Sequence, residues 1–338
     1  MRAVVVSRYG GPERLTVADW PEREPGSGEL RVRVRAAGVN FADVLARKGL
    51  YLGAPRPPFV PGFELAGEVE AVGPEVADMR GRRVLALVPF GAQAEQVVVR
   101  ADYVFSIPEE MPFEEAAALP VNYLTAYYAL VEMAALREGE SVLVHMAAGG
   151  VGLAALQIAR TVPGVELFGT ASPSKHELLR QYGCHPIDYR SRDYEQEVRQ
   201  LTRARGVHVI LDPLGGRDTA KNYRLLRPTG RLILYGVTRL SRGPRRNVLA
   251  ALWEYLRMPR FHPLRLMWEN RAVIGLHLGR LWSERERLRR AMETLLVWYR
   301  EGRIRPVLDR VYPFSEAASA HRRIEARENV GKIVLVPG

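Results

Sequence analysis

The sequence contains a single cysteine, Cys184, among its 338 residues. One thiol excludes an intramolecular disulfide, and the stretch Met1 to Gly11 predicts a short strand and turn rather than a secretory signal. Long apolar runs are also missing. The longest, Ala116 to Leu136, is interrupted by Pro120 and Asn122, whereas a membrane helix needs about 20 apolar residues in succession. We therefore expect a soluble, cytoplasmic protein.

Lysine is scarce, with four residues against 45 arginines, although the net charge is +11. The arginines alternate with glutamates along the chain and form no single basic block, so no stable nucleic-acid or membrane partner is expected. Heat-adapted surface ion pairs or a GC-rich genome explain this bias better than a binding site does. The charge is still compatible with small anionic ligands.

The length and the 47% apolar content predict about two domains with a sizeable core. The first 110 residues contain short strand-like runs between Gly and Pro turns, which predict a mostly antiparallel β unit. These runs are Arg2 to Val6, Leu30 to Val34, Gly67 to Val72, Arg83 to Val88 and Ala94 to Val99.

From about Pro120 the pattern changes to strands alternating with helices, which is typical of a parallel sheet covered by helices. Five strands are predicted there: Ser141 to Met146, Val165 to Thr170, Val207 to Leu211, Arg231 to Tyr235 and Arg271 to Leu278. A charged helix from Ser283 to Glu301 follows. The final strands, Val307 to Tyr312 and Lys332 to Val336, can rejoin the N-terminal β unit and make that domain discontinuous.

A glycine-rich turn separates the first of these strands from a helical segment. The string Ala147-Ala-Gly149-Gly150-Val151-Gly152 is the dinucleotide pattern G-x-G-x-x-G with Ala147 in place of the first glycine. Gly149 allows the backbone to approach a pyrophosphate, Gly152 allows the helix to pack on the sheet, and the helix N-terminus receives the phosphate charge. The strand before and the helix after the turn favour a dinucleotide site over an ordinary turn.

The second predicted strand of this region lacks the acidic residue that holds the adenosine ribose in NAD sites. Ser172, Ser174 and Lys175 stand there instead, and they offer hydroxyls and a cation to a 2′-phosphate. NADPH is therefore the expected cofactor. The alternative for Lys175 is a solvated residue in the first turn of a helix.

Three segments together resemble the medium-chain dehydrogenase/reductase superfamily: Gly38-Val-Asn40 through Tyr51, Pro61-Gly-Phe63-Glu64-Leu-Ala-Gly67, and the glycine-rich turn. Within it, the chain resembles the zinc-free quinone oxidoreductase (zeta-crystallin-like) family. The segments Asn270 to Gly279 and Glu328 to Gly338 are most similar to its branch of vesicle amine transport protein homologues.

This resemblance implies an α/β fold with two domains. A GroES-like, β-rich catalytic domain comprises residues 1–121 and 281–338, and a Rossmann domain with a doubly wound parallel sheet comprises residues 122–280. It also implies no metal site. Asn40, Phe63 and Val121 occupy the positions where zinc-dependent relatives have their ligands, and a tetrahedral zinc site needs clustered Cys or His.

Without zinc, reduction of an isolated carbonyl loses its Lewis acid, whereas quinones and other conjugated carbonyl compounds spread the developing charge themselves. The resemblance places Asn40 and Tyr51 as catalytic donors to the substrate oxygen or the nascent enolate. Their alternative roles are a turn-capping Asn and a partly buried loop Tyr. We expect an NADPH-dependent reductase of quinones or conjugated carbonyls.

Further cofactor contacts are implied at the ends of the parallel strands. Tyr189 would contact the 2′-phosphate or the adenine, Gly236 would flank the nicotinamide, and backbone groups near His277 would bind the carboxamide, with His277 itself more typical of a core or surface histidine. The complete set of these additional contacts is Tyr189, Asp212, Gly236, Leu276, His277 and Leu278.

Residues 247–268 form an apolar segment broken by Pro259 and Pro263, which predicts a helix, a turn and a helix. A substrate hood, dimer or core packing, and membrane contact are the three interpretations of this segment. The expected assembly is a homodimer. Two other functions stay open: an enoyl-thioester or enone reductase with Tyr51 as proton donor, and an NADPH-binding protein that acts as a nucleic-acid or membrane-surface partner.

Overall fold

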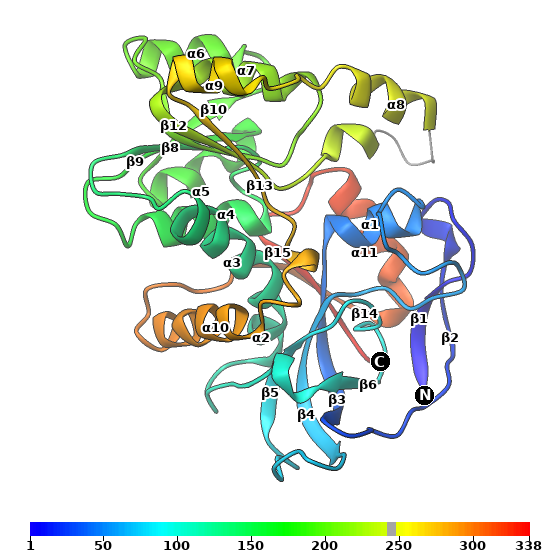
Figure 1. Ribbon diagram of the computed structural model, residues 1–338. Coiled ribbons are helices and arrows are strands. Elements are labelled where there is room, and N and C mark those ends of the chain that lie inside the picture. Colours follow the sequence, from blue (N-terminus) through cyan, green and yellow to red (C-terminus); the bar gives the residue numbers. More distant parts are fainter. Residues whose placement is uncertain (242–247) are drawn as a thin grey trace. The chain divides into compact units, whose positions relative to one another are not determined.

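The computed structural model describes residues 1–241 and 248–338 of a mixed α/β protein. The described residues form two compact units (Figure 1). The first comprises residues 1–124 and 279–338, and the second comprises residues 125–241 and 248–278. Because most contacts lie within a unit, each can be described by itself.

The first unit is built on a sheet with the strand order β14-β15-β3-β4-β5-β7, in which β6 also pairs with β3. The final strand, β15, pairs antiparallel with β3, so that Ile333 faces Val39 and both ends of the chain contribute to one sheet. The strands of this unit are β1 (Arg2–Val6), β2 (Leu15–Asp19), β3 (Glu29–Val39), β4 (Glu64–Val72), β5 (Arg83–Leu87), β6 (Gln96–Arg100), β7 (Val104–Ser106), β14 (Leu308–Pro313) and β15 (Lys332–Val336). Its helices include α1 (Phe41–Arg47), α2 (Phe113–Ala118), α10 (Arg285–Arg300) and α11 (Ala317–Glu325), and α3 (Pro120–Tyr127) leads into the second unit.

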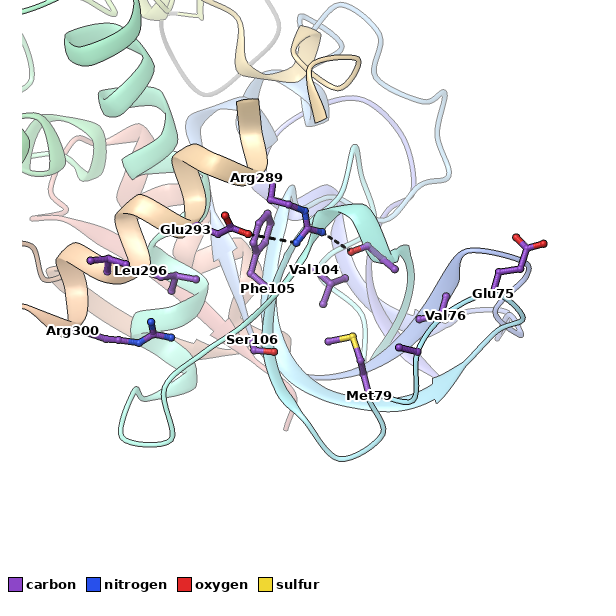
Figure 2. Close-up of a pocket in the computed structure, with 13 residues that line it drawn as sticks. Glu75, Val76, Met79, Val104, Phe105, Ser106, Arg289, Glu293, Leu296 and Arg300 are labelled. Atoms are coloured by element: carbon purple, nitrogen blue, oxygen red, sulfur yellow. Dashed lines mark hydrogen bonds and ion pairs between the residues drawn. The ribbon is translucent and has the colours of Figure 1, made fainter. Parts of the chain in front are cut away.

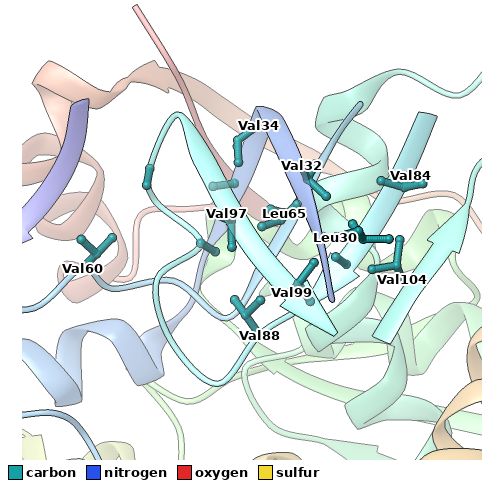
Figure 3. Packing of buried hydrophobic residues seen from close by; sticks show 14 of the residues in the cluster. Leu30, Val32, Val34, Val60, Leu65, Val84, Val88, Val97, Val99 and Val104 are labelled. Carbon is teal, nitrogen blue, oxygen red and sulfur yellow. The ribbon is translucent and has the colours of Figure 1, made fainter. Parts of the chain in front are cut away.

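Strand β3 shows why this sheet has a buried face. Leu30, Val32 and Val34 are buried in the core, which they share with valines of β5 and β6 (Figure 3). The alternate arginines point to the other face of the strand, and Arg31 and Arg33 form ion pairs with Glu70 of β4. A side-chain period of two in a strand produces this division. Opposite charges paired across strands in this way stabilise the sheet.

The second unit is a parallel sheet with the order β10-β9-β8-β11-β12-β13. Figure 1 shows α4 and α5 on one side of this sheet and α6, α7 and α9 on the other. The strands are β8 (Ser141–Val144), β9 (Glu166–Ala171), β10 (Cys184–Asp188), β11 (Val207–Asp212), β12 (Leu226–Leu234) and β13 (Ala272–Gly275). The helices are α4 (Gly150–Ala159), α5 (His176–Gln181), α6 (Tyr194–Leu201), α7 (Arg217–Leu225), α8 (Val248–Leu256) and α9 (Pro263–Glu269). This is the predicted Rossmann arrangement of a parallel sheet with helices on both faces.

The sequence prediction of five strands in this region was wrong by one, because it missed β10. Strand β10 contains Pro186 and an exposed His185, so its sequence lacks a continuous apolar run. It lies at the sheet edge, where a proline can be accommodated because one side of the strand forms no ladder. Edge position therefore explains why the pattern was weak.

Other boundaries also differ from the predictions. Strand β12 begins at Leu226 rather than Arg231, and β13 ends at Gly275 rather than Leu278. Helix α10, predicted from Ser283 to Glu301, covers Arg285–Arg300. The predicted helix, turn and helix of residues 247–268 corresponds to α8 and α9, with residue 247 outside the described ranges. Among the described residues, no helix combines the length and apolar character required to cross a bilayer.

Candidate functional site

The glycine-rich turn lies between the end of β8 at Val144 and the start of α4 at Gly150. Met146 adopts a left-handed conformation with φ of 53°, and its carbonyl accepts a hydrogen bond from the N–H of Gly149 at 2.8 Å. The turn delivers the chain directly into the helix, of which Gly150, Val151 and Gly152 form the first turn. N–H groups at a helix start have no acceptors within the helix, so this position suits an anion.

Gly152 packs against the backbone of the turn itself. A Cβ atom on Gly152 would lie 2.5 Å from the carbonyl oxygens of both Met146 and Ala147, which is closer than Cβ atoms approach such atoms. A Cβ on Gly149 would lie 3.2 Å from the Met146 oxygen, which is a milder conflict. Glycine is therefore required sterically at position 152. Gly149 and Gly150 are half-buried and present backbone without a side chain, and we call the turn of residues 147–152 the glycine cradle.

His145 is buried beneath this turn. Its Nδ1 lies 3.1 Å from Thr170 Oγ1, and its Nε2 lies 2.8 Å from Asn222 Oδ1. Because Asn222 Oδ1 can only accept, Nε2 carries the proton, and Nδ1 accepts from the Thr170 hydroxyl. Burial lowers the pKa of His145, which holds the ring neutral. The ring thus ties the start of the turn to β9 and α7.

The end of β9 presents the residues predicted to bind a 2′-phosphate. Ser172 is buried and its hydroxyl lies 3.4 Å from that of Ser174, while the half-buried Lys175 closes the same short turn through its N–H to the Ser172 carbonyl at 2.9 Å. In the neighbouring strand, Asp188 pairs with Ala171, but its carboxylate accepts hydrogen bonds from the turn that follows it, at Arg190 N and Ser191 Oγ. That turn also contains the half-buried Tyr189.

The ends of β11 and β12 hold two more predicted contacts. Asp212 is fully buried, and its carboxylate accepts hydrogen bonds from Leu214 N at 2.8 Å, Gly215 N at 3.1 Å and Thr219 Oγ1 at 3.0 Å. The carboxylate thus shapes its own loop. A Cβ on Gly236 would lie 2.9 Å from the Pro213 carbonyl oxygen, so the two strand ends approach each other closely at this glycine.

The three residues after β13 differ in what they can offer to a ligand. Leu276 is buried, and its N–H already donates to the Leu234 carbonyl at 2.8 Å, so this N–H extends the β12–β13 pairing instead of serving a carboxamide. His277 is exposed and Leu278 is half-buried. The Leu276 carbonyl and the backbone groups of His277 and Leu278 stay predicted contacts of the carboxamide.

In the first unit, Asn40 is the N-cap of α1 and is almost completely buried. Its Nδ2 donates to Glu64 Oε1 at 2.8 Å, and its Oδ1 accepts from Lys332 Nζ at 2.6 Å. Lys332 also donates to Glu64 Oε1. The other carboxylate oxygen of Glu64 accepts from Val121 N at 2.7 Å. All four polar side-chain atoms of Asn40 and Glu64 therefore have a hydrogen-bond partner.

Asp43 lies beside this group, completely buried. Its two oxygens accept hydrogen bonds from Asn40 N at 2.7 Å and Gly62 N at 2.8 Å. Burial raises the pKa of Asp43 to about 7, against the lowering effect of these two N–H donors and of Lys332. Asp43 therefore fixes the start of α1 and links it to the loop that precedes β4.

Tyr51 lies in the loop after α1 and packs in an aromatic group. Its ring centroid lies 5.5 Å from that of Phe63 and 6.1 Å from that of Phe90. Burial, together with the nearby charge of Asp43, raises the pKa of the Tyr51 phenol, so the hydroxyl stays protonated at neutral pH. A protonated phenol can serve as a hydrogen-bond or proton donor.

A hollow of about 500 Å³ lies elsewhere in the first unit, between α10 and the region of β7 (Figure 2). Apolar side chains such as Met79 and Phe105 line it, together with Arg289 and Glu293, which form an ion pair. None of the predicted site residues lines this hollow. Within residues 1–241 and 248–338, no group of three or more His, Cys, Asp or Glu side chains is arranged to hold a metal ion.

Sequence reasoning missed the part played by Lys332, Glu64 and Asp43. The rarity of lysine was one signal, because only four positions needed attention and two of them are buried. Lys332 and Lys48 are buried, and Lys221 forms an ion pair with Asp193. A charged residue within an apolar strand, such as Glu64 in Phe-Glu-Leu-Ala, is a second signal of the same kind.

Comparison with known proteins extends over the whole chain. Residues 26–109 match the family "Alcohol dehydrogenase GroES-like domain", and residues 183–335 match the family "Zinc-binding dehydrogenase". The synaptic vesicle membrane protein VAT-1 homolog of Rattus norvegicus is 47% identical over 342 residues, which cover 100% of this chain and 84% of the relative. A quinone oxidoreductase of Pseudomonas aeruginosa is 36% identical over 340 residues and 99% of both chains.

Among solved structures, the Escherichia coli quinone oxidoreductase complexed with NADPH superimposes with a TM-score of 0.88 at 28% identity and covers 100% of both chains. The match therefore extends over the residues of both units. The expected α/β fold, a GroES-like domain with a Rossmann domain, is confirmed. The chain belongs to the quinone oxidoreductase family of the medium-chain dehydrogenase/reductase superfamily, together with the VAT-1 homologues.

Proposed function

We propose that this protein reduces quinones or other conjugated carbonyl compounds with NADPH, by hydride transfer and without zinc. The observation that carries the proposal is the glycine cradle between β8 and α4, where Gly152 is sterically required and the helix start faces the turn. Its support from relatives is the quinone oxidoreductase of 36% identity and the Escherichia coli structure complexed with NADPH.

The residues of the second unit fit such a cofactor. Gly149 to Gly152 and Ala147 would hold the pyrophosphate at the N-terminus of α4. Ser172, Ser174 and Lys175 would bind the 2′-phosphate, with Tyr189 beside them. Asp212 would contribute to cofactor binding indirectly, because its carboxylate accepts hydrogen bonds from the loop after β11 and fixes the shape of that loop. Gly236 and the segment from Leu276 to Leu278 would face the nicotinamide end.

When bound, NADPH supplies a hydride from its nicotinamide ring. Hydride and a proton together reduce a quinone to a hydroquinone or saturate a conjugated carbonyl compound. Asn40 would donate an N–H to the substrate oxygen, and Tyr51, whose phenol is held protonated, would donate a hydrogen bond or the proton. These are the two proposed catalytic residues.

We also propose that no metal takes part. Asn40, Phe63 and Val121 stand at the ligand positions of zinc-dependent relatives. Here the Asn40 amide is hydrogen-bonded to Glu64, Phe63 packs against Tyr51, and Val121 donates its backbone N–H to Glu64. Turnover should survive exhaustive chelation. Stoichiometric, tightly held zinc whose removal abolishes turnover would contradict this part of the proposal.

We propose that the two domains have different functions: residues 1–121 and 281–338 form the catalytic domain, and residues 122–280 form the domain that binds the cofactor. The two compact units, whose boundaries along the chain fall near residues 124 and 278, support this division. A homodimer is proposed as well. Strand β13 ends the order of the parallel sheet, and an edge strand can pair with the same strand of a second copy. Sedimentation equilibrium would measure the assembly.

The experiment is an acceptor panel followed at the nicotinamide absorbance. Benzoquinones, naphthoquinones, enones, an enoyl thioester and saturated aldehydes are offered with NADPH. The proposal expects turnover with the conjugated acceptors and none with the saturated aldehydes. Turnover confined to the enoyl thioester would favour the alternative reductase, and turnover with saturated aldehydes would exclude the proposal.

A second function is suggested by exposed apolar side chains on α8 and α9. Leu249 is 80% exposed and Trp268 is 89% exposed, and Arg257 and Arg260 are exposed near them. Leu252, Trp253, Tyr255, Leu256, Leu264 and Met267 are also exposed large hydrophobics. Exposed apolar side chains with cations close by in the sequence suit the interface of an anionic bilayer, and several relatives are named vesicle membrane proteins.

Liposome flotation tests this second function. Binding to anionic vesicles that falls with added salt, together with no turnover of any acceptor, would favour an NADPH-binding membrane-surface protein over a reductase. Vesicles without anionic lipid are the control. The same binding accompanied by normal turnover would mean that both functions belong to one chain.

A further inference from the structure

Lys332 lies at the start of β15, far along the sequence from the two residues that its ammonium group contacts. It donates to Asn40 Oδ1 at 2.6 Å and to Glu64 Oε1, and it is 3% exposed. Glu64, at the start of β4, is completely buried. The ammonium group thus joins the loop after β3, the first residue of β4 and the first residue of β15.

These contacts determine which way the Asn40 amide points. An ammonium group has no lone pair, so the Asn40 atom beside it must be the oxygen. A carboxylate only accepts, so the Asn40 atom beside Glu64 must be the nitrogen. The amide is therefore fixed from both sides. Of its two N–H bonds, one is used by Glu64, and the second is the only donor left on the side chain.

The buried ion pair of Lys332 and Glu64 is not explained by a contribution to folding stability alone. Desolvation of an ammonium and a carboxylate opposes folding, and proteins in which a buried pair is replaced by apolar side chains are often as stable or more stable. The chain also gives up a side chain at Gly38 to accommodate it, because a Cβ there would lie 2.5 Å from Glu64 Oε1. A structural pair with this cost calls for a function beyond packing.

We propose that Lys332 is a positioning residue for the reaction: with Glu64 it holds the Asn40 amide so that its second N–H donates to the carbonyl oxygen of the acceptor. This inference rests on the proposed function, in which Asn40 contacts the substrate oxygen. An amide that is prevented from rotating needs no reorganisation when charge develops on that oxygen, which is the source of oxyanion stabilisation in enzymes.

The test is a double-mutant cycle on kcat. The paired variant K332M/E64Q removes both charges at once, so that neither is left buried and unpaired. We expect it to lower kcat about tenfold or more, the scale of a weakened oxyanion donor, while the dissociation constant of NADPH changes by less than about twofold. In an Asn40→Ala background the same paired change should lower kcat no further, because residues that act through one group are not additive.

A matched control uses the ion pair between Arg323 and Asp309, which lies in the same unit and contacts β14. The variant R323M/D309N should lower the melting temperature without changing kcat. If it lowers kcat as much as K332M/E64Q does, the effect reports general loosening of the unit, and the positioning role is excluded. Additive losses in the cycle would exclude it as well.

A readout independent of turnover keeps this test separate from the proposed function. The chain has six asparagines, so protein labelled with ¹⁵N-asparagine gives six pairs of side-chain N–H signals, and the Asn40 pair is identified by its absence in Asn40→Ala. We expect slow proton exchange at this amide in the wild-type protein and exchange at least about tenfold faster in K332M/E64Q, since a fixed buried hydrogen bond protects its proton. Unchanged exchange would overturn the positioning role, whereas a wild-type protein inert towards every acceptor would overturn the proposed function and leave the exchange result standing.

Discussion

Gly152 presses so closely on Ala147 that a methyl group on Gly152 would lie 2.5 Å from the Ala147 carbonyl oxygen. The contact sits where α4 leaves the turn after β8, so any movement that relieves it also moves the helix start. Ala147 itself is held by its N–H, which donates to the Thr170 carbonyl of β9 at 3.0 Å. The turn therefore cannot move away easily.

Gly152→Ala should both destabilise the protein and weaken NADPH binding. Forcing a methyl group into such a contact costs typically about 1 to 3 kcal/mol, and the displaced helix start would no longer meet a phosphate. Thermal unfolding and fluorescence titration with NADPH measure the two effects. Gly149→Ala, with its milder 3.2 Å contact, should show a smaller loss.

Gly275→Ala is the matched control for this prediction, because a Cβ on Gly275 of β13 meets no atom within 4 Å. It should leave the affinity for NADPH unchanged. Equal affinities for Gly152→Ala and Gly275→Ala would show that the cradle does not bind the cofactor.

Lys175→Glu should reduce the affinity for NADPH by about 1 to 3 kcal/mol and leave NADH unaffected, since a charge-assisted bond to the 2′-phosphate is replaced by repulsion. Lys221→Glu is the control: it makes the same change of charge on α7, where Lys221 pairs with Asp193 at 2.9 Å. Titration of each variant with both cofactors is the measurement. Equal affinities of the wild-type protein for NADPH and NADH would refute the premise of this prediction, which is that the site recognises the 2′-phosphate.

His321 of α11 provides a prediction about pH. It is completely buried, and neither ring nitrogen has a hydrogen-bond partner among the described residues. Burial and the nearby cations of Arg47 and Lys48 lower the pKa of His321 well below 6.5. Glu325 carries the opposing charge, at 2.9 Å from Arg47 and 2.6 Å from Lys48.

Because the folded pKa of His321 is below the unfolded value, the unfolded chain binds a proton first as the pH falls. The stability contribution is complete above about pH 6.5 and is lost below it, at about 1.4 kcal/mol per pH unit. Asp43 acts in the opposite direction, since its pKa is raised to about 7 and stability from this group grows as the pH falls below 7. The two effects must therefore be separated by mutation.

His321→Leu removes the first effect and keeps the second. The difference in free energy of unfolding between His321→Leu and the wild-type protein should grow in favour of the variant from pH 6.5 to pH 5. Denaturant unfolding at several pH values measures this difference. A constant difference over that range would mean that the folded protein does not lower the pKa of His321.

The sequence predicted the architecture well where the pattern was periodic. Arg2–Val6 and Lys332–Val336 have the predicted bounds, because in each strand one charged residue is followed by four apolar residues in succession. The glycine-rich turn was recognisable because strand, turn and helix follow in direct succession. Strand β10 was missed because Pro186 and the edge position remove the apolar pattern.

The candidate site was harder to predict, because its contacts are long-range. Asn40 and Lys332 are 292 residues apart, and no local pattern joins them. Asn40 was placed as a donor by resemblance, and the structure shows in addition that it caps α1 and is bonded on both sides. The sequence therefore indicated which residues matter but not what fixes them.

Tyr51→Phe should slow reduction of an enone more than reduction of a reactive quinone. The phenylalanine ring keeps the contacts of Tyr51 with Phe63 and Phe90, so packing is preserved and only the hydroxyl is lost. An enone needs a proton at carbon or oxygen in the slow step, where a positioned acid contributes about 100-fold or more, whereas a quinone accepts hydride with little help. Steady-state kinetics with both acceptors is the measurement, and Tyr103→Phe, which removes a hydroxyl bonded to the Trp282 carbonyl in the same unit, is the control. If Tyr51→Phe raises the Michaelis constant equally for both acceptors and leaves kcat unchanged, then Tyr51 only binds substrate, because uniform loss of affinity affects the ground state and the transition state alike.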